Sequence, residues 1–325
     1  MNLRTRTWLA RAAACLLVAA AGAASAADYP SKAITLIVPF PAGGTTDSIA
    51  RIVGAKLTER LHTQVVIDNR TGAGGNIGAV LLAHAAGDGY TLMMAPPGPL
   101  TINFNLYKDL QFDPRKFVPI SMVANMPNVL VVGPSVKATS LAELIADAKA
   151  NPGKLTFASQ GNGTTSHLTG IYFASKVGIN IAHVPYKGSA PALNDLIAGR
   201  IDMMFDNITT TLPFHNAKKA NILAVATKKR IPSAPNVPTM AEAGLPGFES
   251  GTWVALVAPE GTPPEIAARL SKEVAEIIKL PEVTSKFAGF GADPVGGTPA
   301  QTGALLHEES MRWKSVIDAA HVTIE

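Results

Sequence analysis

The stretch ITLIVPFPAGGTTDSIARIV, residues 34–53, contains a complete strand, turn and helix start. Residues 34–40 are short, β-branched and bounded by proline and glycine, which predicts a buried strand. Residues 47–61 place apolar side chains at helical spacing, which predicts a helix, with Asp47 in the position of its N-cap. The glycines between the two elements allow the main chain to approach a ligand closely.

A second stretch, KLTFASQGNGTTSHLTGIYF at 154–173, repeats this design with a strand at 155–158, a glycine-rich turn and a helix from about Ser166. The rest of the chain alternates in the same way. Further strands are predicted at 65–67, 90–95, 129–132, 181–184, 202–205, 222–226 and 253–258. Further helices are predicted at 77–86, 140–150 with Ser140 as N-cap, 190–198, 264–279 and 299–319.

This alternation predicts an α/β fold in which mainly parallel sheets are flanked by helices. The chain builds one such unit, then a second, and returns to the first through a proline- and glycine-rich linker at 230–247. We therefore expect two lobes, the first formed by 27–124 and 228–325 and the second by 125–227. Open α/β sheets bind ligands at the carboxyl ends of their strands, so the expected site is a cleft between the lobes.

The first 26 residues are typical of a secretory signal peptide. Three arginines precede an apolar run at 12–22, and Ala24-Ser25-Ala26 forms a small-residue cleavage site. Cleavage would remove three of the 28 basic residues, none of the 24 acidic residues, and the single cysteine, Cys15. The remaining chain would be almost neutral, which argues against a nucleic-acid partner. We expect an exported, periplasmic protein.

The two glycine-rich turns are the strongest candidates for a binding site. Each follows a strand and precedes a helix, where the first N–H groups point outward and the helix dipole favours a negative charge. Residues 41–45 carry Thr45 on this turn, and 161–165 carry Thr164 and Thr165. Two such turns in equivalent positions predict that an anion is held between opposing helix N-termini.

Other motifs lack a residue that a known nucleotide-binding or catalytic site requires. In residues 69–78 the third glycine of a dinucleotide-binding fingerprint would fall at position 77, which is Ile77. Ser159 lacks the glycine that a nucleophile elbow needs two positions earlier. An exported hydrolase that pairs Ser159 or Ser166 with His167 remains the alternative from another class, although His167, His183 and His215 are more typical of structural or surface residues.

Two further strand ends carry polar side chains. Asp206-Asn207 follows the strand at 202–205, where the pair could contact a ligand or cap the next segment. A functional Asp206 would accept a hydrogen bond from an ammonium or hydroxyl group rather than bind a carboxylate. Tyr186-Lys187 follows the strand at 181–184, and Lys187 could supply positive potential or remain solvated.

Several motifs in order along the chain resemble one family, the Bug solute-binding proteins, which are the extracytoplasmic receptors of tripartite tricarboxylate transporters. The motifs are Pro39-Phe40-Pro41-Ala42-Gly43-Gly44-x-x-Asp47, Asn69-Arg70-x-Gly72-Ala73-Gly74-Gly75-Asn76, Asp88-Gly89-Tyr90, Ser159-x-Gly161-x-Gly163-Thr164-x-x-His167, Val184-Pro185-Tyr186-Lys187-Gly188, Phe205-Asp206-Asn207 and Val237-Pro238-Thr239. They span nearly all of the chain after residue 26.

The resemblance implies a two-lobed periplasmic binding protein of the second structural type that binds small organic acids, including dicarboxylates, acidic amino acids and aromatic acids. It implies no catalysis and no cofactor or metal; the expected partners are a small carboxylate and membrane transporter subunits, and we expect a monomer. The implied ligand-binding residues are Phe40, Pro41, Ala42, Gly43, Gly44, Thr45, Pro97, Gly161, Asn162, Gly163, Thr164, Thr165, Tyr186, Asp206 and Asn207.

The chain departs from the family pattern at 95–100, where Pro96-Pro97 and Leu100 replace more polar residues. A Leu100 that faces the cleft would favour a less polar ligand end. A role as a sensor subunit, which presents its acid to a signalling receptor, differs only in the partner and stays open at this point.

Overall fold

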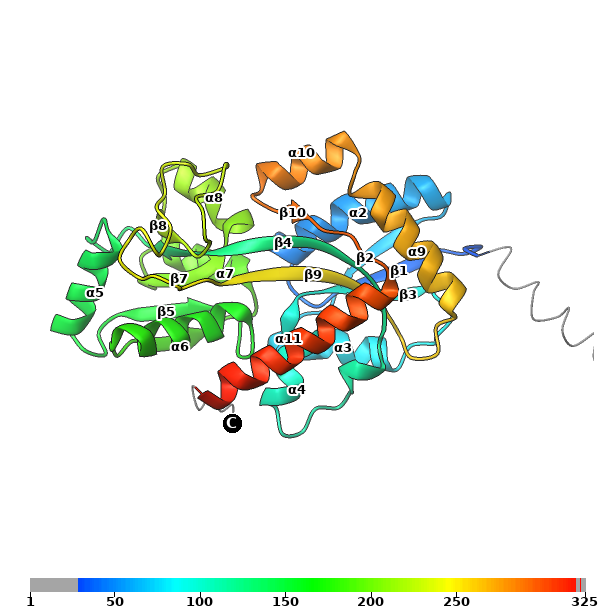
Figure 1. The fold of residues 1–325 in the computed structure, drawn as a ribbon, viewed down its shortest axis with the longest axis horizontal. Helices are drawn as coiled ribbons and strands as arrows, with labels where there is room; N and C mark the ends of the chain where they lie inside the picture. Colours follow the sequence, from blue (N-terminus) through cyan, green and yellow to red (C-terminus); the bar gives the residue numbers. More distant parts are fainter. Residues whose placement is uncertain (1–28, 320–321, 323–325) are drawn as a thin grey trace, which may run out of the picture.

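The computed structural model describes residues 29–319 and residue 322, so the predicted signal peptide at 1–26 lies outside the described residues. The fold is a two-lobed α/β structure (Figure 1). Its strands are β1 (Ile34–Val38), β2 (Val65–Asn69), β3 (Thr91–Ala95), β4 (Val118–Val132), β5 (Thr156–Ser159), β6 (Ala182–Pro185), β7 (Met203–Asn207), β8 (Asn221–Val225), β9 (Gly251–Ala258) and β10 (Asp293–Pro294).

The α-helices are α2 (Thr45–Leu61), α3 (Asn76–Ala83), α4 (Asn103–Leu106), α5 (Leu141–Ala150), α6 (Thr165–Val177), α7 (Ser189–Ile197), α8 (Ile208–Asn216), α9 (Pro264–Ile277), α10 (Pro281–Gly289) and α11 (Pro299–Ala319). Short helical turns lie at η1 (Ala73–Gly75), η2 (Gly98–Ile102) and η3 (Pro114–Lys116). Ser140 is confirmed as the N-cap of α5, since its hydroxyl accepts the N–H of Glu143 at 3.2 Å.

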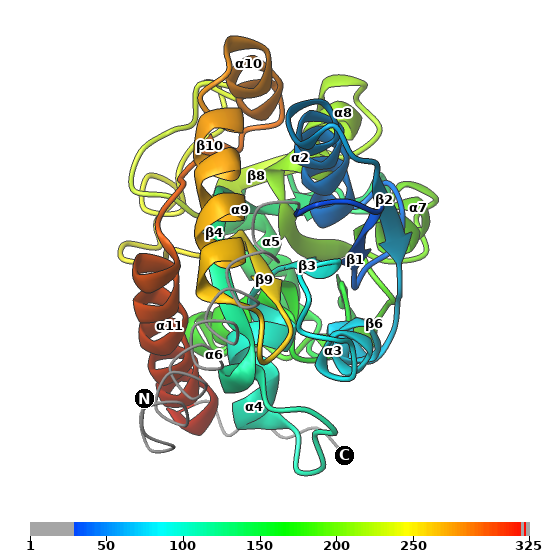
Figure 2. The same cartoon turned by 90° about the vertical axis from the view of Figure 1, so that its right-hand side faces the viewer.

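Each lobe contains a parallel group of strands, as the alternating pattern predicts. In the first lobe β1 pairs in parallel with β2 and β3, and β3 pairs antiparallel with β9. In the second lobe β5 pairs in parallel with β6 and β7. Figure 2 looks onto the first lobe and shows α2 and α3 on opposite sides of its sheet.

The long strand β4 connects the lobes. Its first part pairs with β9, and its last five residues, 128–132, pair with β7 in the second lobe. Figure 1 shows β4 and β9 running side by side between the lobes. The sequence predicts only 129–132 as strand, because Pro119 and Pro127 interrupt the apolar pattern of the residues that precede 129. In the structure those preceding residues are also part of the strand, since they pair with β9. The division of the chain into lobes at 125 and 228 stays a prediction.

Apolar cores lie on both faces of each sheet. In the first lobe Leu36, Ile49 and Leu270 belong to the core beneath α2 and α9, whereas Ile37 and Leu82 belong to the core beneath α3. The segment 230–247, predicted as a loose linker, contains no helix, yet it is packed rather than loose. Its Val237 and Met240 are buried in the cores of the second lobe.

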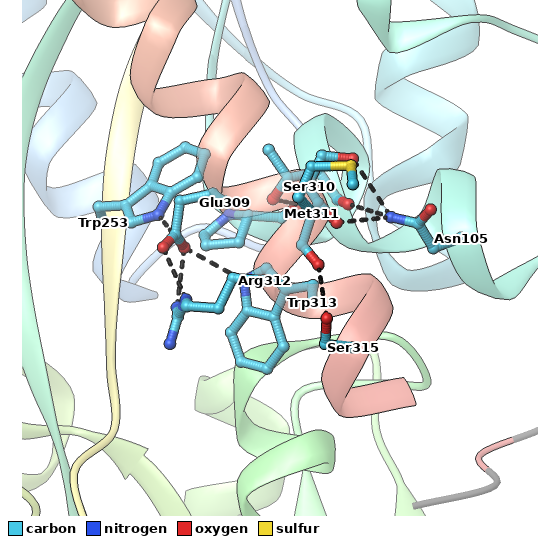
Figure 3. A network of polar contacts seen from close by, with 10 residues as sticks. Asn105, Trp253, Glu309, Ser310, Met311, Arg312, Trp313 and Ser315 are labelled. Atoms are coloured by element: carbon cyan, nitrogen blue, oxygen red, sulfur yellow. Dashed lines mark hydrogen bonds and ion pairs between the residues drawn. The ribbon is translucent and has the colours of Figure 1, made fainter. Parts of the chain in front are cut away.

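The carboxylate of one residue, Glu309, joins helix α11 to strand β9 by a hydrogen bond (Figure 3). Glu309 accepts the indole N–H of Trp253 at 3.0 Å and that of Trp313 at 3.2 Å, and it forms an ion pair with Arg312. Trp313 belongs to an apolar cluster that also contains Leu168 of the second lobe. The helix therefore packs at the boundary between the lobes.

Candidate ligand-binding site between the lobes

The first-lobe turn forms the uncapped N-terminus of α2. Gly43 adopts φ +79°, and the N-cap is Gly44, from which no side-chain cap bond is made. Asp47 is therefore not the N-cap, and that prediction is wrong. Asp47 lies at the third helical position, because the helix is capped at Gly44, three residues earlier than the capping preference of Asp47 suggests. Because glycine has no side chain, the N-cap residue offers no oxygen to the first N–H groups of the helix, which belong to Thr45 and Thr46.

Asp47 instead holds the turn in shape. Its buried carboxylate accepts the N–H of Gly43 at 2.9 Å, the Nε–H of Arg51 at 2.9 Å and the amide of Asn69 at 3.0 Å. Burial alone would raise the pKa of Asp47, but these hydrogen bonds outweigh burial and lower the pKa below its ordinary value. The carboxylate thus stays ionised and its oxygens are occupied by the protein.

The second-lobe turn precedes α6. Gly161 and Gly163 adopt φ +125° and +78°, conformations that favour glycine. Thr164 is the N-cap; its hydroxyl accepts the N–H of His167 at 3.3 Å and donates to the carbonyl of Gly161 at 2.7 Å. The buried Thr165 is the first helical residue, in the position that Thr45 occupies in α2.

The turns of the two lobes meet across the cleft. The Asn207 amide donates to the Thr45 hydroxyl at 3.0 Å, and the Tyr107 hydroxyl donates to the carbonyl of Asn162 at 3.3 Å. A methyl group added to Gly188 would lie 2.6 Å from Pro41 Cδ. The structure is therefore in a closed arrangement in which side chains and main chain of both lobes form the contact.

A cavity of about 180 Å³ opens between the lobes at this meeting point. Four predicted site residues line it, namely Phe40, Gly161, Asn162 and Tyr186. The Tyr186 hydroxyl donates to Asp195 at 2.8 Å, so this hydroxyl is engaged with the protein, and the side chain packs against a core of the second lobe. The ligand contacts themselves stay predictions.

Two predicted features have surroundings that sequence alone does not show. Asp206 is fully buried and accepts hydrogen bonds from Gln160, from Ser189 at 2.8 Å and from Thr210 at 2.9 Å. Burial raises its pKa. Leu100 packs in the first-lobe core with Ile37 rather than facing the cleft, because η2 turns it toward the sheet. It therefore gives no argument for an apolar ligand end.

Sequence reasoning missed the turn at 72–75 as part of the site. Residues 69–78 contain an incomplete nucleotide-binding fingerprint and one of the family motifs, and neither places them in the site. In the structure Gly72, Ala73, Gly74 and Gly75 line the cavity, and Gly74 faces Asn162 of the other lobe. Tyr107 and Gln160 also line the cavity without a sequence signal. The run of glycines in 72–75 was the available signal, since glycine permits close approach of two backbones.

The hydrolase arrangement predicted as an alternative does not form around His167. The Ser159 hydroxyl lies 2.7 Å from Nε2 of His183, and the Ser166 hydroxyl donates to the carbonyl of Phe205. Both serines are fully buried. His167 and His183 stack with their ring centroids 4.2 Å apart beneath the second-lobe turn, where the N–H of Gly163 points to Nδ1 of His167 at 3.4 Å.

The buried His167 and the half-buried His183 predict a stability that falls in acid. Burial lowers the pKa of His167 to about 3, with a further contribution from His183, and burial lowers the pKa of His183 to about 4. The unfolded chain titrates near 6.5, so it holds more protons than the folded chain between pH 6.5 and 4. Stability is therefore fully present above pH 6.5 and is lost as the pH falls toward 4, by at most about 1.4 kcal/mol per pH unit for each histidine.

Urea unfolding at pH 7 and pH 5 checks this expectation. A variant with His167→Gln and His183→Gln should lose less stability between the two pH values than the unmodified protein. The exposed His307→Gln serves as the control and should leave the pH dependence unchanged. An equal loss in all three proteins would show that the histidine pair is not responsible.

Two α/β lobes joined by crossing strands, with a cavity between them, define a two-lobed solute-binding protein. The solved periplasmic binding protein BugD is 33% identical, with a TM-score of 0.88 over 91% of this chain and 100% of that chain. A family model described as "Tripartite tricarboxylate transporter family receptor" matches residues 49–322. The chain belongs to this receptor family.

Two further solved structures of similar proteins contain acids. The structure of R. palustris Rpa4515 with adipate is 40% identical, with a TM-score of 0.89 over 91% of this chain and 99% of that chain. MatC from Rhodopseudomonas palustris with bound malate is 32% identical, with a TM-score of 0.83 over 89% of this chain and 100% of that chain. Among the residues that the structure describes, no helix is long and apolar enough to cross a membrane.

Proposed function

We propose that the protein captures a small organic acid between its lobes in the periplasm and presents it to the membrane subunits of a tripartite tricarboxylate transporter. The observation that carries the proposal is the pair of helix N-termini, at Thr45 and Thr165, that begin at turns facing the same cleft. The carboxylate is held by main-chain N–H groups and hydroxyls, which stabilise a negative charge without a cationic side chain. Family membership and the predicted signal peptide support the transport role and the location.

The protein acts by binding and closure rather than by chemistry. A ligand that contacts both turns binds the closed arrangement more tightly than the open one, so it shifts the lobes toward closure. The fully buried Ser159 and Ser166 are engaged with protein partners, which gives a substrate no exposed nucleophile at these two positions.

Isothermal titration against a panel of acids tests the proposal. The panel contains aliphatic monocarboxylates, dicarboxylates, tricarboxylates, acidic amino acids and aromatic acids, with the corresponding amides as uncharged controls. At least one acid should bind, its amide should not, and small-angle scattering should show a more compact protein with the acid present. If no acid binds, or if the amide binds as tightly as the acid, the proposed function is wrong.

A further inference from the structure

The segment 102–107, which contains the end of η2 and all of α4, lies against the turn that begins α6. A methyl group added to Gly163 of that turn would overlap the Oδ1 atom of Asn103 and would lie 3.4 Å from Cδ2 of Leu106. The side chains of Asn103 and Leu106 are both buried. Two buried side chains of the first lobe therefore lie against the main chain of the second-lobe turn.

One hydrogen bond crosses between the lobes at the end of this segment. The Tyr107 hydroxyl donates to the carbonyl of Asn162 at 3.3 Å. Beside it, Leu106 belongs to the same apolar cluster as Leu168 of α6. Both contacts join one part of the protein to another and require the turn and the segment to be together. They stabilise the closed arrangement to the same extent whichever ligand is bound.

The first lobe holds the segment on the side of the turn 72–75. The amide of Asn103 donates to the carbonyl of Gly74 at 3.2 Å and to Oδ1 of Asn76 at 2.5 Å. Asn103 is fully buried, so its side chain has little freedom to move away from these partners. The segment and the turn 72–75 therefore form one rigid face of the first lobe toward the second.

Helix α11 holds the segment on another side (Figure 3). The amide of Asn105 donates to the carbonyl of Ser310 at 3.0 Å and to its hydroxyl oxygen at 3.2 Å. The same helix carries Trp313, which belongs to the cluster of Leu106 and Leu168. Asn105 lies outside the set of described residues that line the cavity between the lobes. It can influence closure only through the position of the segment.

We infer that the segment 102–107 is a closure latch, in which Tyr107 holds the second-lobe turn and Asn105 is a positioning residue that fixes the segment on α11. The inference rests on the proposed function, because closure affects affinity only if an acid is captured between the lobes. The latch multiplies the affinity for every acid by the same factor, since the protein alone makes its contacts. It acts mainly by slowing the opening that releases the acid.

The variant Tyr107→Phe tests the latch, since it removes only the hydroxyl. Every acid of the panel that binds should bind about 3- to 10-fold more weakly, by a common factor, and should dissociate faster in stopped-flow tryptophan fluorescence. The common factor separates a latch from a ligand contact, because Tyr107 also lines the cavity. The exposed Tyr172 of α6 supplies the control, and Tyr172→Phe should change neither affinity nor dissociation rate.

The variant Asn105→Ala tests the positioning role. It should weaken every acid by about three- to fivefold, and in the Tyr107→Phe protein it should weaken binding by less than twofold, because both residues act on one contact. Asn151 is a matched control at the end of α5, where its amide donates to the carbonyl of Asp147 at 3.2 Å and to its Oδ1 at 2.9 Å. Asn151→Ala should cost a similar stability in urea and leave the affinity unchanged.

The latch is overturned if Tyr107→Phe weakens one acid and spares another, if it changes no acid, or if the effects of Tyr107→Phe and Asn105→Ala simply multiply. In those cases the unmodified protein still binds acids and the proposed function stands. Failure of every acid to bind the unmodified protein would instead contradict the proposed function, and the latch with it.

Discussion

Replacing Gly74 by valine is expected to weaken acid binding by about 100-fold. A side chain at this position overlaps the main-chain carbonyl of Asn162 in the other lobe, and a carbonyl in a hydrogen-bonded turn cannot move aside as a flexible side chain does. The closed arrangement is disfavoured, and the apparent affinity falls with the fraction of molecules that can close. A penalty of about 3 kcal/mol on closure corresponds to this 100-fold loss.

The control for Gly74→Val is Gly178→Val. Gly178 ends α6 with φ +67°, close to the +63° of Gly74, but a methyl group there meets no atom within 4 Å. Both variants carry a similar backbone strain of about 1–2 kcal/mol, so both should be less stable in urea. Only Gly74→Val should lose affinity and remain extended in small-angle scattering when the acid is added. Equal binding by the two variants would show that closure at Gly74 is not needed.

Replacing Thr45 by proline is expected to weaken acid binding by about 10- to 100-fold relative to Thr45→Val. Thr45 is the first residue of α2, where proline fits the helix and removes only the N–H group. The preceding Gly44 already has the extended ψ of 171° that a following proline requires. A hydrogen bond from this N–H to a charged carboxylate contributes about 1.5–3 kcal/mol, which corresponds to the expected loss.

The valine variant isolates the main-chain contribution. Both replacements remove the hydroxyl that accepts the amide of Asn207, but Thr45→Val keeps the N–H. Circular dichroism and urea unfolding should show that both variants fold with similar stability. Affinity for the acid, measured by titration calorimetry, should separate them. If the two variants bind equally, the N–H of Thr45 does not hold the ligand.

Local signals were sufficient to predict most of the fold. The apolar spacing of Ile49, Val53 and Leu57 predicts α2, and all three are buried under the sheet. Residue type alone predicts the capping of α5 by Ser140, and the structure confirms it. By contrast, α8, with the sequence ITTTLPFHN, was not predicted, because its threonines and Pro213 give a weak helical pattern and its stability comes from packing.

The candidate site was harder to predict because its contacts join distant segments. Glycine-rich turns indicate a helix N-terminus, but no local sequence pattern predicts that Gly74 lies against Asn162 or that Asn207 pairs with Thr45. Asp47 has the residue type of an N-cap, yet the turn sets the cap at Gly44 and leaves the carboxylate to accept hydrogen bonds from Arg51 and Asn69. Such assignments depend on tertiary geometry.

A crystal structure of the protein with the acid that binds most tightly in the titrations tests the account most directly. One carboxylate of the acid is expected within hydrogen-bond distance of the first N–H groups of α2 and α6, at about 2.7–3.1 Å from the nitrogens of Thr45 and Thr165. A ligand whose inner carboxylate is held by arginine or lysine side chains, or that lies away from both helix N-termini, would contradict the account.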